Sequence, residues 1–136
     1  MKEICLEAVK ENIPQATAFV EAELEALDCP IKTQMLISVA IDEVFTNIAS
    51  YAYAPGTGKA YLRFEYDENS HTALITFIDS GVPFNPLENP DPDVTLSAEE
   101  RAIGGLGIFM VKKTMDDMVY ERKGNENVLR ISKKLF

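Results

Sequence analysis

Cysteine is scarce in this 136-residue sequence, and long apolar runs are missing. Cys5 and Cys29 lie far apart and belong to no CxxC or Cys/His cluster, so a disulfide framework or a structural zinc site has little support. We expect both to be small buried side chains. No stretch approaches the roughly 18 uninterrupted apolar residues of a membrane helix, and the N-terminus opens with the charged residues Lys2 and Glu3. We therefore expect a cytoplasmic protein with no membrane association.

Basic residues are also few, because 13 Lys and Arg stand against 22 Asp and Glu, giving a net charge of -9. Proteins that bind the nucleic-acid backbone normally present a basic surface, so direct nucleic-acid binding is not expected. A basic protein partner is compatible with this charge. An acidic protein can still bind a nucleoside triphosphate if backbone amides, a divalent cation and one or two basic side chains offset the charge locally.

The remaining composition is that of an ordinary globular domain, with 46% apolar and 26% charged residues. A chain of this length can bury roughly 68–70% of the surface that it exposes when unfolded. No internal repeat or linker divides it. We therefore expect residues 1–136 to form a single domain.

Apolar spacing predicts helices in the first half of the chain. A short strand over residues 4–9 is followed by an amphipathic helix over 14–27, which Asp28, Cys29 and Pro30 interrupt. A longer helix then runs from residue 31 to about 54. Its buried stripe consists of Ile37, Ala40, Ile41, Val44, Ile48 and Ala52.

The second half is predicted to be mostly strands. Residues 59–66 and 72–78 resemble a hairpin, and residues 119–122 and 128–135 give two closing strands. Between the two pairs lies a proline-rich segment, 81–104, that is typical of an active-site lid. A helix follows it, with one face formed by Ile108, Val111, Met115 and Met118. Together these elements predict an α+β two-layer sandwich, with helices on one face of a mostly antiparallel sheet.

Two familiar phosphate-binding motifs do not fit. Gly58-Lys59 is followed by Ala60 instead of Ser or Thr, and Tyr53 stands where the first glycine of a P-loop belongs. The glycines around Leu106 fail the dinucleotide fingerprint because Met110 occupies its third glycine position.

A different set of three motifs is more informative. Glu43 and Asn47 are four residues apart and share one side of the long helix, where an amide oxygen can ligate Mg²⁺. A solvated polar face is the commoner explanation for such a pair alone. Asp79 ends an apolar strand and precedes Gly81; its carboxylate can accept from the exocyclic amine of adenine, and a glycine lets a base approach the backbone. An ordinary Asp-Ser-Gly turn explains that motif equally well.

The third motif is Gly104-Gly105-Leu106-Gly107, which opens the helix that follows the lid. Each glycine costs roughly 1 kcal/mol against alanine inside a helix, so this density needs a reason. One reason would be that glycines let a phosphate group approach the free amides at a helix N-terminus closely. A flexible hinge is the alternative.

In this order the three motifs resemble the N box, the Asp-x-Gly box and the glycine box of the GHKL ATP-binding superfamily, which has the Bergerat-type fold. The match covers nearly the whole sequence. Residues 42–47 and 104–108 look most like the bacterial anti-sigma factor serine/threonine kinases. That family phosphorylates a serine on an anti-anti-sigma (STAS-domain) regulator and sequesters a sigma factor, so the resemblance implies both partners. It also suggests a homodimer.

The resemblance implies a role for each motif residue, with ATP and Mg²⁺ as cofactors. Glu43 would be the general base for a serine hydroxyl, Asn47 the Mg²⁺ ligand, and Arg101 the cation facing the terminal phosphates. Adenine and phosphate contacts would come from Asp79, Gly81, Gly104, Gly105, Leu106 and Gly107. Such a set suits phosphoryl transfer, which depends on positioning and charge stabilisation.

Two positions depart from the family pattern and three alternatives stay open. Tyr51 replaces a histidine found in many members, and residues 127–132 lack a threonine often found near adenine. The alternatives are a non-catalytic ATP-binding partner-switch module, a histidine-kinase catalytic fragment and an α+β domain without nucleotide. Against the fragment, no dimerisation helix pair is recognisable, and the only histidine, His71, lies in a predicted hairpin turn.

Overall fold

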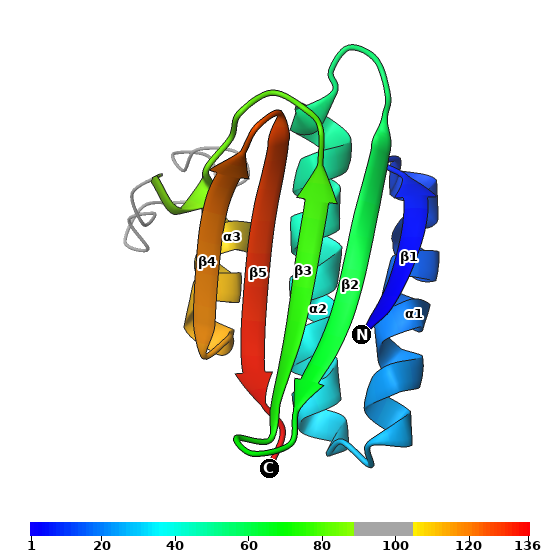
Figure 1. The fold of residues 1–136 in the computed structure, drawn as a ribbon, viewed down its shortest axis with the longest axis vertical. Helices are drawn as coiled ribbons and strands as arrows, with labels where there is room; N and C mark the ends of the chain where they lie inside the picture. The colour runs from blue at the N-terminus through cyan, green and yellow to red at the C-terminus, as the bar shows by residue number, and fades with distance from the viewer. Residues whose placement is uncertain (89–104) are drawn as a thin grey trace.

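A computed structural model describes residues 1–88 and 105–136 of the chain. In these two ranges, three α-helices pack on one face of a five-stranded sheet whose order is β1-β2-β3-β5-β4, with every pair antiparallel. All three helices lie behind the sheet in Figure 1. The elements are β1 (Lys2–Glu7), α1 (Ile13–Ala26), α2 (Ile31–Asn47), η2 (Ile48–Ala52), β2 (Lys59–Asp67), β3 (Thr72–Asp79), η3 (Pro86–Glu88), α3 (Gly105–Thr114), β4 (Asp117–Lys123) and β5 (Glu126–Lys134), with a short 3-10 turn, η1 (Lys10–Asn12), before α1. The predicted two-layer α+β architecture is therefore confirmed.

The break between the first two helices has a local cause. Asp28 adopts a left-handed conformation with φ of 57°. Its N–H donates to the carbonyl of Glu25 at 3.0 Å, and the N–H of Cys29 donates to the carbonyl of Leu24 at 3.0 Å. This is the Schellman pattern that satisfies the last carbonyls of a helix. Pro30 then precedes α2, where its missing N–H costs nothing.

The core lies between α2 and the inner face of the sheet. All six residues of the predicted helix stripe are buried, as are the inward-facing residues of the three central strands. Hydrophobic burial of this kind is the main favourable term in folding. The strand residues are Ala60, Leu62, Phe64, Ala73, Ile75, Phe77, Leu129 and Ile131.

The segment Ile31–Ala52, which comprises α2 and η2, is long and apolar enough to cross a membrane by length and composition, with a mean hydropathy of 1.2 over its best window. Its apolar character has another explanation in this fold. Ile37, Ile41 and Phe45 are fully buried beneath the sheet. A core helix of a two-layer domain needs such residues, so this segment gives only weak support for a membrane span.

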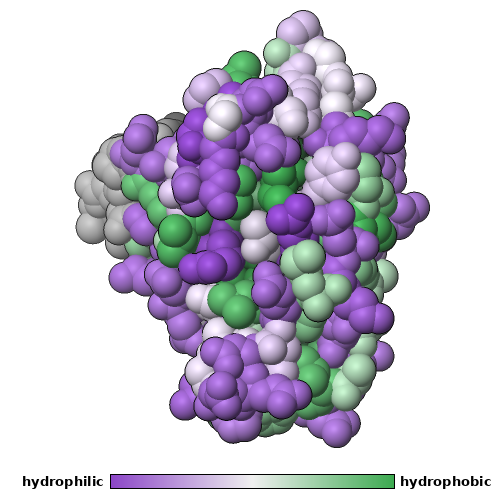
Figure 2. Space-filling model, in the orientation of Figure 1, coloured by the Kyte–Doolittle hydropathy of each residue, from purple (hydrophilic) through white to green (hydrophobic). Residues whose placement is uncertain are grey.

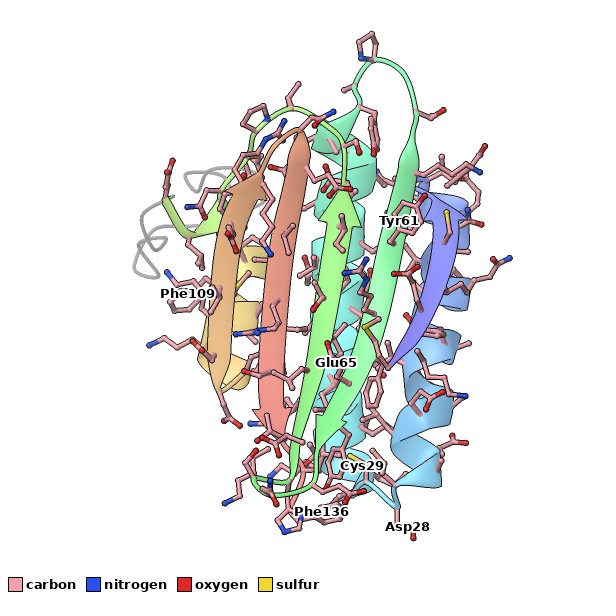
Figure 3. All side chains as sticks on the ribbon, viewed as in Figure 1. Asp28, Cys29, Tyr61, Glu65, Phe109 and Phe136 are labelled. Atoms are coloured by element: carbon pink, nitrogen blue, oxygen red, sulfur yellow. The ribbon has the colours of Figure 1, made fainter. Side chains whose placement is uncertain are left out.

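No helix of the described ranges covers the other face of the sheet. This face is shown toward the viewer in Figure 2, where hydrophilic residues surround smaller apolar patches. Side chains alternate between the two faces along each strand. Tyr61 and Glu65, labelled in Figure 3, lie on the open face, whereas Leu62 and Phe64 face the helices. Cys5 is also exposed because of this alternation, so the expectation that both cysteines are buried was wrong for Cys5 and right for Cys29.

Several element boundaries differ from the sequence prediction, and two of the affected elements are α3 and β1. Helix α3 ends at Thr114, so Met118 lies in β4 and not on the helix face predicted for it. Beyond the helix, the N–H of Asp116 donates to the carbonyl of Ser132 on β5 at 2.9 Å. Pairing with β5 thus begins immediately after the helix and ends it. The first strand begins at Lys2 and ends at Glu7, two residues earlier at each end than predicted.

Candidate functional site

An open cavity lies between the helix layer and the sheet, and it encloses about 450 Å³ of empty space, counting the part open to solvent. Residues from α2, η2, β3, α3, β4, β5 and the segment after β3 line it. Most of its walls are apolar, with a few polar groups, which is the usual composition of a small-molecule site. Its polar side chains include Asn47, Asp79 and Asn127. Two of the three sequence motifs therefore contribute to one cavity.

The helical wall of the cavity depends on a change of helix type. Helix α2 continues directly into η2, a single π-helical turn. Across this junction Val44, Asn47, Ile48, Tyr51 and Ala52 all line the cavity. Such π-turns are rare and frequently occur at functional sites.

Asp79 is the last residue of β3, and only 5% of its surface is exposed. Its Oδ1 accepts hydrogen bonds from the backbone N–H of Gly81 and from Nδ2 of Asn127, each at 2.9 Å. Within residues 1–88 and 105–136, its Oδ2 has no protein donor. A buried carboxylate oxygen without a donor is costly, so the cavity favours a ligand that brings an N–H or O–H group to Asp79.

Asn127 is a site residue that the sequence prediction did not identify. It lies on β5 directly opposite Asp79 on β3, and 6% of its surface is exposed. Among the residues that the structure describes, Asp79 and Asn127 are the only buried polar or charged side chains. The burial of Asn127 could have been predicted from the sequence, because it stands two and four residues before Leu129 and Ile131 and shares the inward face of β5 with them.

Glu43 and Gly107 meet where α2 passes α3. Glu43 is half-buried, and a Cβ atom added to Gly107 would overlap its carboxylate. The absence of a side chain at residue 107 therefore leaves room for the carboxylate of Glu43. Asn47, one turn further along α2, donates from Nδ2 to the carbonyl of Glu43 at 3.1 Å. The structure thus brings the predicted base, the predicted metal ligand and the predicted phosphate loop to one region.

No cluster of three His, Cys, Asp or Glu side chains that could hold a metal occurs in the part of the chain that the structure describes. Mg²⁺ does not require one, because it keeps several waters and takes one or two protein oxygens together with substrate phosphates. The Oδ1 of Asn47, whose Nδ2 is occupied by the Glu43 carbonyl, is the cavity oxygen that suits this role.

Gly81 has a packing reason to be glycine. A Cβ at this position would overlap the backbone carbonyl of Ala52 in η2, and the N–H of the next residue, Val82, donates to that carbonyl at 2.9 Å. Gly81 does not line the cavity. Its glycine therefore fixes β3 against η2, and its predicted contact with adenine stays a prediction.

Two aromatic residues, Tyr51 and Phe84, form part of the cavity wall, and the sequence prediction gave neither of them a role in the site. The rings of Tyr51 and Phe84 lie with their centroids 6.2 Å apart and their planes tilted by 31°. Both are partly exposed, at 45% and 37%. Aromatic faces at the mouth of a cavity are suited to stacking on a planar ring. The sequence singled out only Tyr51 of the two, because it replaces a histidine that many members of the family carry at this position.

The glycine box is described only in part. Helix α3 begins at Gly105, and Leu106 and Gly107 lie in its first turn. Arg101 and Gly104 fall outside the described residues, as does most of the proline-rich segment predicted to be a lid.

The fold and the cavity define a class of protein: a two-layer α+β domain with a mostly apolar cavity between its helices and its sheet. Residues 6–133 match the histidine kinase-like ATPase domain family, and the chain belongs to that family. The resemblance found from the three sequence motifs is therefore confirmed.

Its relatives include named protein kinases. The serine/threonine-protein kinase BtrW of Bordetella bronchiseptica is 22% identical over 101 residues, which cover 74% of this chain and 70% of that protein. The serine-protein kinases RsbW of Bacillus thuringiensis and Bacillus cereus are 30% identical over 86 residues, which cover 60% of this chain. The matched region spans 52% of their length.

Among solved structures, the histidine kinase domain of the blue-light activated histidine kinase from Erythrobacter litoralis has a TM-score of 0.54 and 18% sequence identity, over 78% of this chain and 46% of that one. At this identity the likeness concerns the fold alone.

Proposed function

We propose that this protein binds ATP with Mg²⁺ and is an anti-sigma factor serine/threonine kinase. In this proposal it transfers the γ-phosphoryl group of ATP to a serine of an anti-anti-sigma protein with a STAS domain, and it sequesters a sigma factor in the cytoplasm. The observation that carries the proposal is the buried carboxylate of Asp79, which has one satisfied oxygen and one oxygen left for a ligand donor. Membership of the ATPase family and the names of the relatives support it.

The Asp79 end of the cavity is proposed to hold adenine. The exocyclic amine of adenine is a donor that can satisfy Oδ2, and the purine ring matches the apolar walls. Tyr51 and Phe84, whose rings lie near each other in the cavity wall, would cover the purine ring. Recognition of this kind needs no basic residue, which is consistent with the acidic composition of the chain.

The phosphates are proposed to extend toward the start of α3. Free amides at a helix N-terminus and the helix dipole both favour a phosphate group there. Asn47 would hold Mg²⁺ through Oδ1, and the ion would neutralise charge on the phosphate oxygens. Gly104, Gly105, Leu106, Gly107 and Arg101 keep the phosphate-binding roles predicted for them.

Glu43 is proposed to accept the proton of the substrate serine. As that proton moves to the Glu43 carboxylate, the serine Oγ forms a bond to the γ-phosphorus. The bond from the γ-phosphorus to the bridging oxygen breaks, and its electron pair leaves with ADP. General-base assistance of this kind contributes typically 10²–10⁴-fold to a rate. The space that Gly107 leaves beside Glu43 supports this assignment, because the carboxylate then lies next to the proposed phosphate loop.

The experiment is phosphoryl transfer from labelled Mg-ATP to a purified cognate anti-anti-sigma protein. Wild-type protein should label that substrate on serine. The variant Glu43→Gln, which keeps the size of the side chain, should bind ATP as the wild type does and transfer phosphate at least about 100-fold more slowly. Asp42→Asn is the matched control, because Asp42 is the neighbouring carboxylate on α2 and is exposed.

The possible results distinguish a kinase that uses Glu43 as its base from the alternative functions. Full activity in Glu43→Gln would refute the assigned base. ATP binding by wild-type protein without any transfer to the substrate would instead favour a non-catalytic partner-switch module that uses ATP to hold a partner-competent shape. Loss of activity in Asp42→Asn equal to that in Glu43→Gln would indicate a general effect of charge on α2 and not a role in the reaction.

A further inference from the structure

Asn127 uses its whole hydrogen-bonding capacity inside the cavity wall. Its Nδ2 donates to Oδ1 of Asp79 at 2.9 Å and to the carbonyl of Val82 at 2.8 Å. Its Oδ1 accepts from the backbone N–H of Phe84 at 3.3 Å and from the hydroxyl of Tyr120 at 2.5 Å. A primary amide has two donor hydrogens and one acceptor oxygen with two lone pairs, so no capacity is left over.

These four partners fix the orientation of the amide. The two donors, the Phe84 N–H and the Tyr120 hydroxyl, converge on one side, and the two acceptors, Asp79 and the Val82 carbonyl, on the other. A flipped amide would place oxygen against a carboxylate and a carbonyl, and nitrogen against an N–H group. The network therefore determines which atom of Asn127 faces Asp79.

The first consequence concerns Asp79. The terminal torsion of an aspartate side chain is broad, so an unrestrained carboxylate can exchange its two oxygens. Two donors, the Gly81 N–H and Nδ2 of Asn127, converge on Oδ1 and oppose this rotation. Oδ2 is then the oxygen of Asp79 that remains available to a ligand, and it offers acceptor sites only.

The second consequence concerns the segment that follows β3. Val82 and Phe84 belong to the segment after β3, and Asn127 bonds the backbone of both. That segment carries the Phe84 ring, which lies beside Tyr51 at the mouth of the cavity. One buried amide thus holds both the free acceptor and the aromatic wall in place.

We propose that Asn127 is a positioning residue that determines the base specificity of the cavity. By fixing Asp79 with one free acceptor, it selects a purine that carries a 6-amino donor over one that carries a 6-oxo acceptor. The 6-oxo group would leave two acceptors facing each other in a buried site, and such mismatches are strongly rejected. The inference rests on the proposed nucleotide-binding function and assigns the source of its selectivity.

Asn127→Asp tests this directly, because it changes one atom of the side chain. The introduced carboxylate can still accept from Phe84 and Tyr120, but it has no donor for Asp79 or for the Val82 carbonyl. The dissociation constants of Mg-ADP and Mg-GDP are measured on the full chain by calorimetry. We expect the dissociation constant of ADP to rise about tenfold or more and the preference for ADP over GDP to fall by a similar factor.

Asn125→Asp is the matched control. Asn125 lies in the exposed turn between β4 and β5, so this variant makes the same charge change two residues away. It should leave both dissociation constants within about twofold of the wild type. A second variant, Tyr120→Phe, keeps the ring in the cavity wall and removes one donor to Oδ1 of Asn127. It should shift the ADP preference in the same direction by about two- to tenfold, even if Asn127→Asp does not fold.

The outcomes distinguish this inference from the function on which it rests. Wild-type protein that binds neither nucleotide contradicts both. Wild-type protein that binds ADP and GDP equally contradicts the specificity and leaves nucleotide binding intact. A preference for ADP that is unchanged in the Asn127 and Tyr120 variants, or an equal loss of affinity for both nucleotides, overturns the positioning role alone.

Discussion

At residue 79, exchanging one carboxylate oxygen for an amide nitrogen tests the proposed adenine contact. In Asp79→Asn, the remaining oxygen can keep the bonds from Gly81 and Asn127, while the new NH₂ group occupies the place of Oδ2. A donor would then face the donor of adenine. Hydrogen bonds to charged groups contribute about 1.5–3 kcal/mol, so we expect ADP affinity to fall about 10- to 150-fold in calorimetry.

GDP affinity should fall less than ADP affinity in the same variant, because a 6-oxo group can accept from the new amide. Glu65→Gln is the control: it neutralises a carboxylate on the open face of β2, far from the helices, and should change neither affinity. An Asp79→Asn protein that is folded and binds ADP as tightly as the wild type would exclude Asp79 as the base contact.

Residue patterns predicted part of this site and missed the rest for a physical reason. Glu43 and Asn47 follow from helical spacing, and Asp79 follows from its place at the end of an apolar strand. Asn127 lies just before the strand predicted for residues 128–135, because the composition of residues 123–127 is typical of a turn. Its partnership with Asp79 is set by the register of β3 and β5, which pair residues 48 positions apart in sequence. Local spacing carries no information about that register.

At the scale of elements, the contact between β3 and η2 can be tested through Gly81→Ala. The added Cβ would overlap backbone atoms of Ala52, which cannot move away as a flexible side chain could. Overpacking of this kind costs about 1–3 kcal/mol. For a chain of 136 residues, this corresponds to a decrease in melting temperature of roughly 3–10 °C.

Nucleotide affinity should also fall in Gly81→Ala, because η2 carries Tyr51 and Ala52 in the cavity wall. Gly56→Ala is the control, since its added Cβ would lie 3.5 Å from the carbonyl oxygen of Tyr53, an ordinary contact, and should change stability by less than about 0.5 kcal/mol. Equal melting temperatures for Gly81→Ala and wild type would show that Gly81 is not required for packing against η2.

The type and order of the elements were predictable, because each helix and strand in this fold has a clear apolar period. The residues at which the elements end were less predictable, because hydrogen bonds to segments distant in sequence determine them. The N–H of Ala8 donates to the carbonyl of Gly58 at 2.8 Å just after β1 ends, and Asp116 joins β5 just after α3 ends. The π-turn that places Tyr51 had no signal in the apolar spacing, which stays compatible with a continuous α-helix through Ala52.

For the whole molecule, the layer architecture followed from two helices in the first half of the chain and two strand pairs around a third helix in the second half. Helices and sheet each have an apolar face, and packing the two faces together buries both. The cavity is a consequence of the same arrangement. It lies where α2, α3 and the strands β3 and β5 approach one another, and its walls come from both halves of the sequence. A ligand held there contacts elements of both layers and should stabilise the folded domain as a unit.

Thermal unfolding with and without Mg-ADP or Mg-ATP tests this coupling. A ligand that binds only the native state stabilises it by about 2.7 kcal/mol at 100 times its dissociation constant. At the entropy of unfolding typical of this chain length, the melting temperature should rise by roughly 5–10 °C. Mg-GDP at the same concentration should raise it less, and chelating the metal should reduce the effect of ADP, since the ion that links Asn47 to the phosphates in this proposal would then be missing. An unchanged melting temperature at millimolar Mg-ADP and Mg-ATP would refute adenine-nucleotide binding in this cavity. The kinase assignment would then lose its basis, because Asp79 is the only buried carboxylate among the described residues and it lines this cavity.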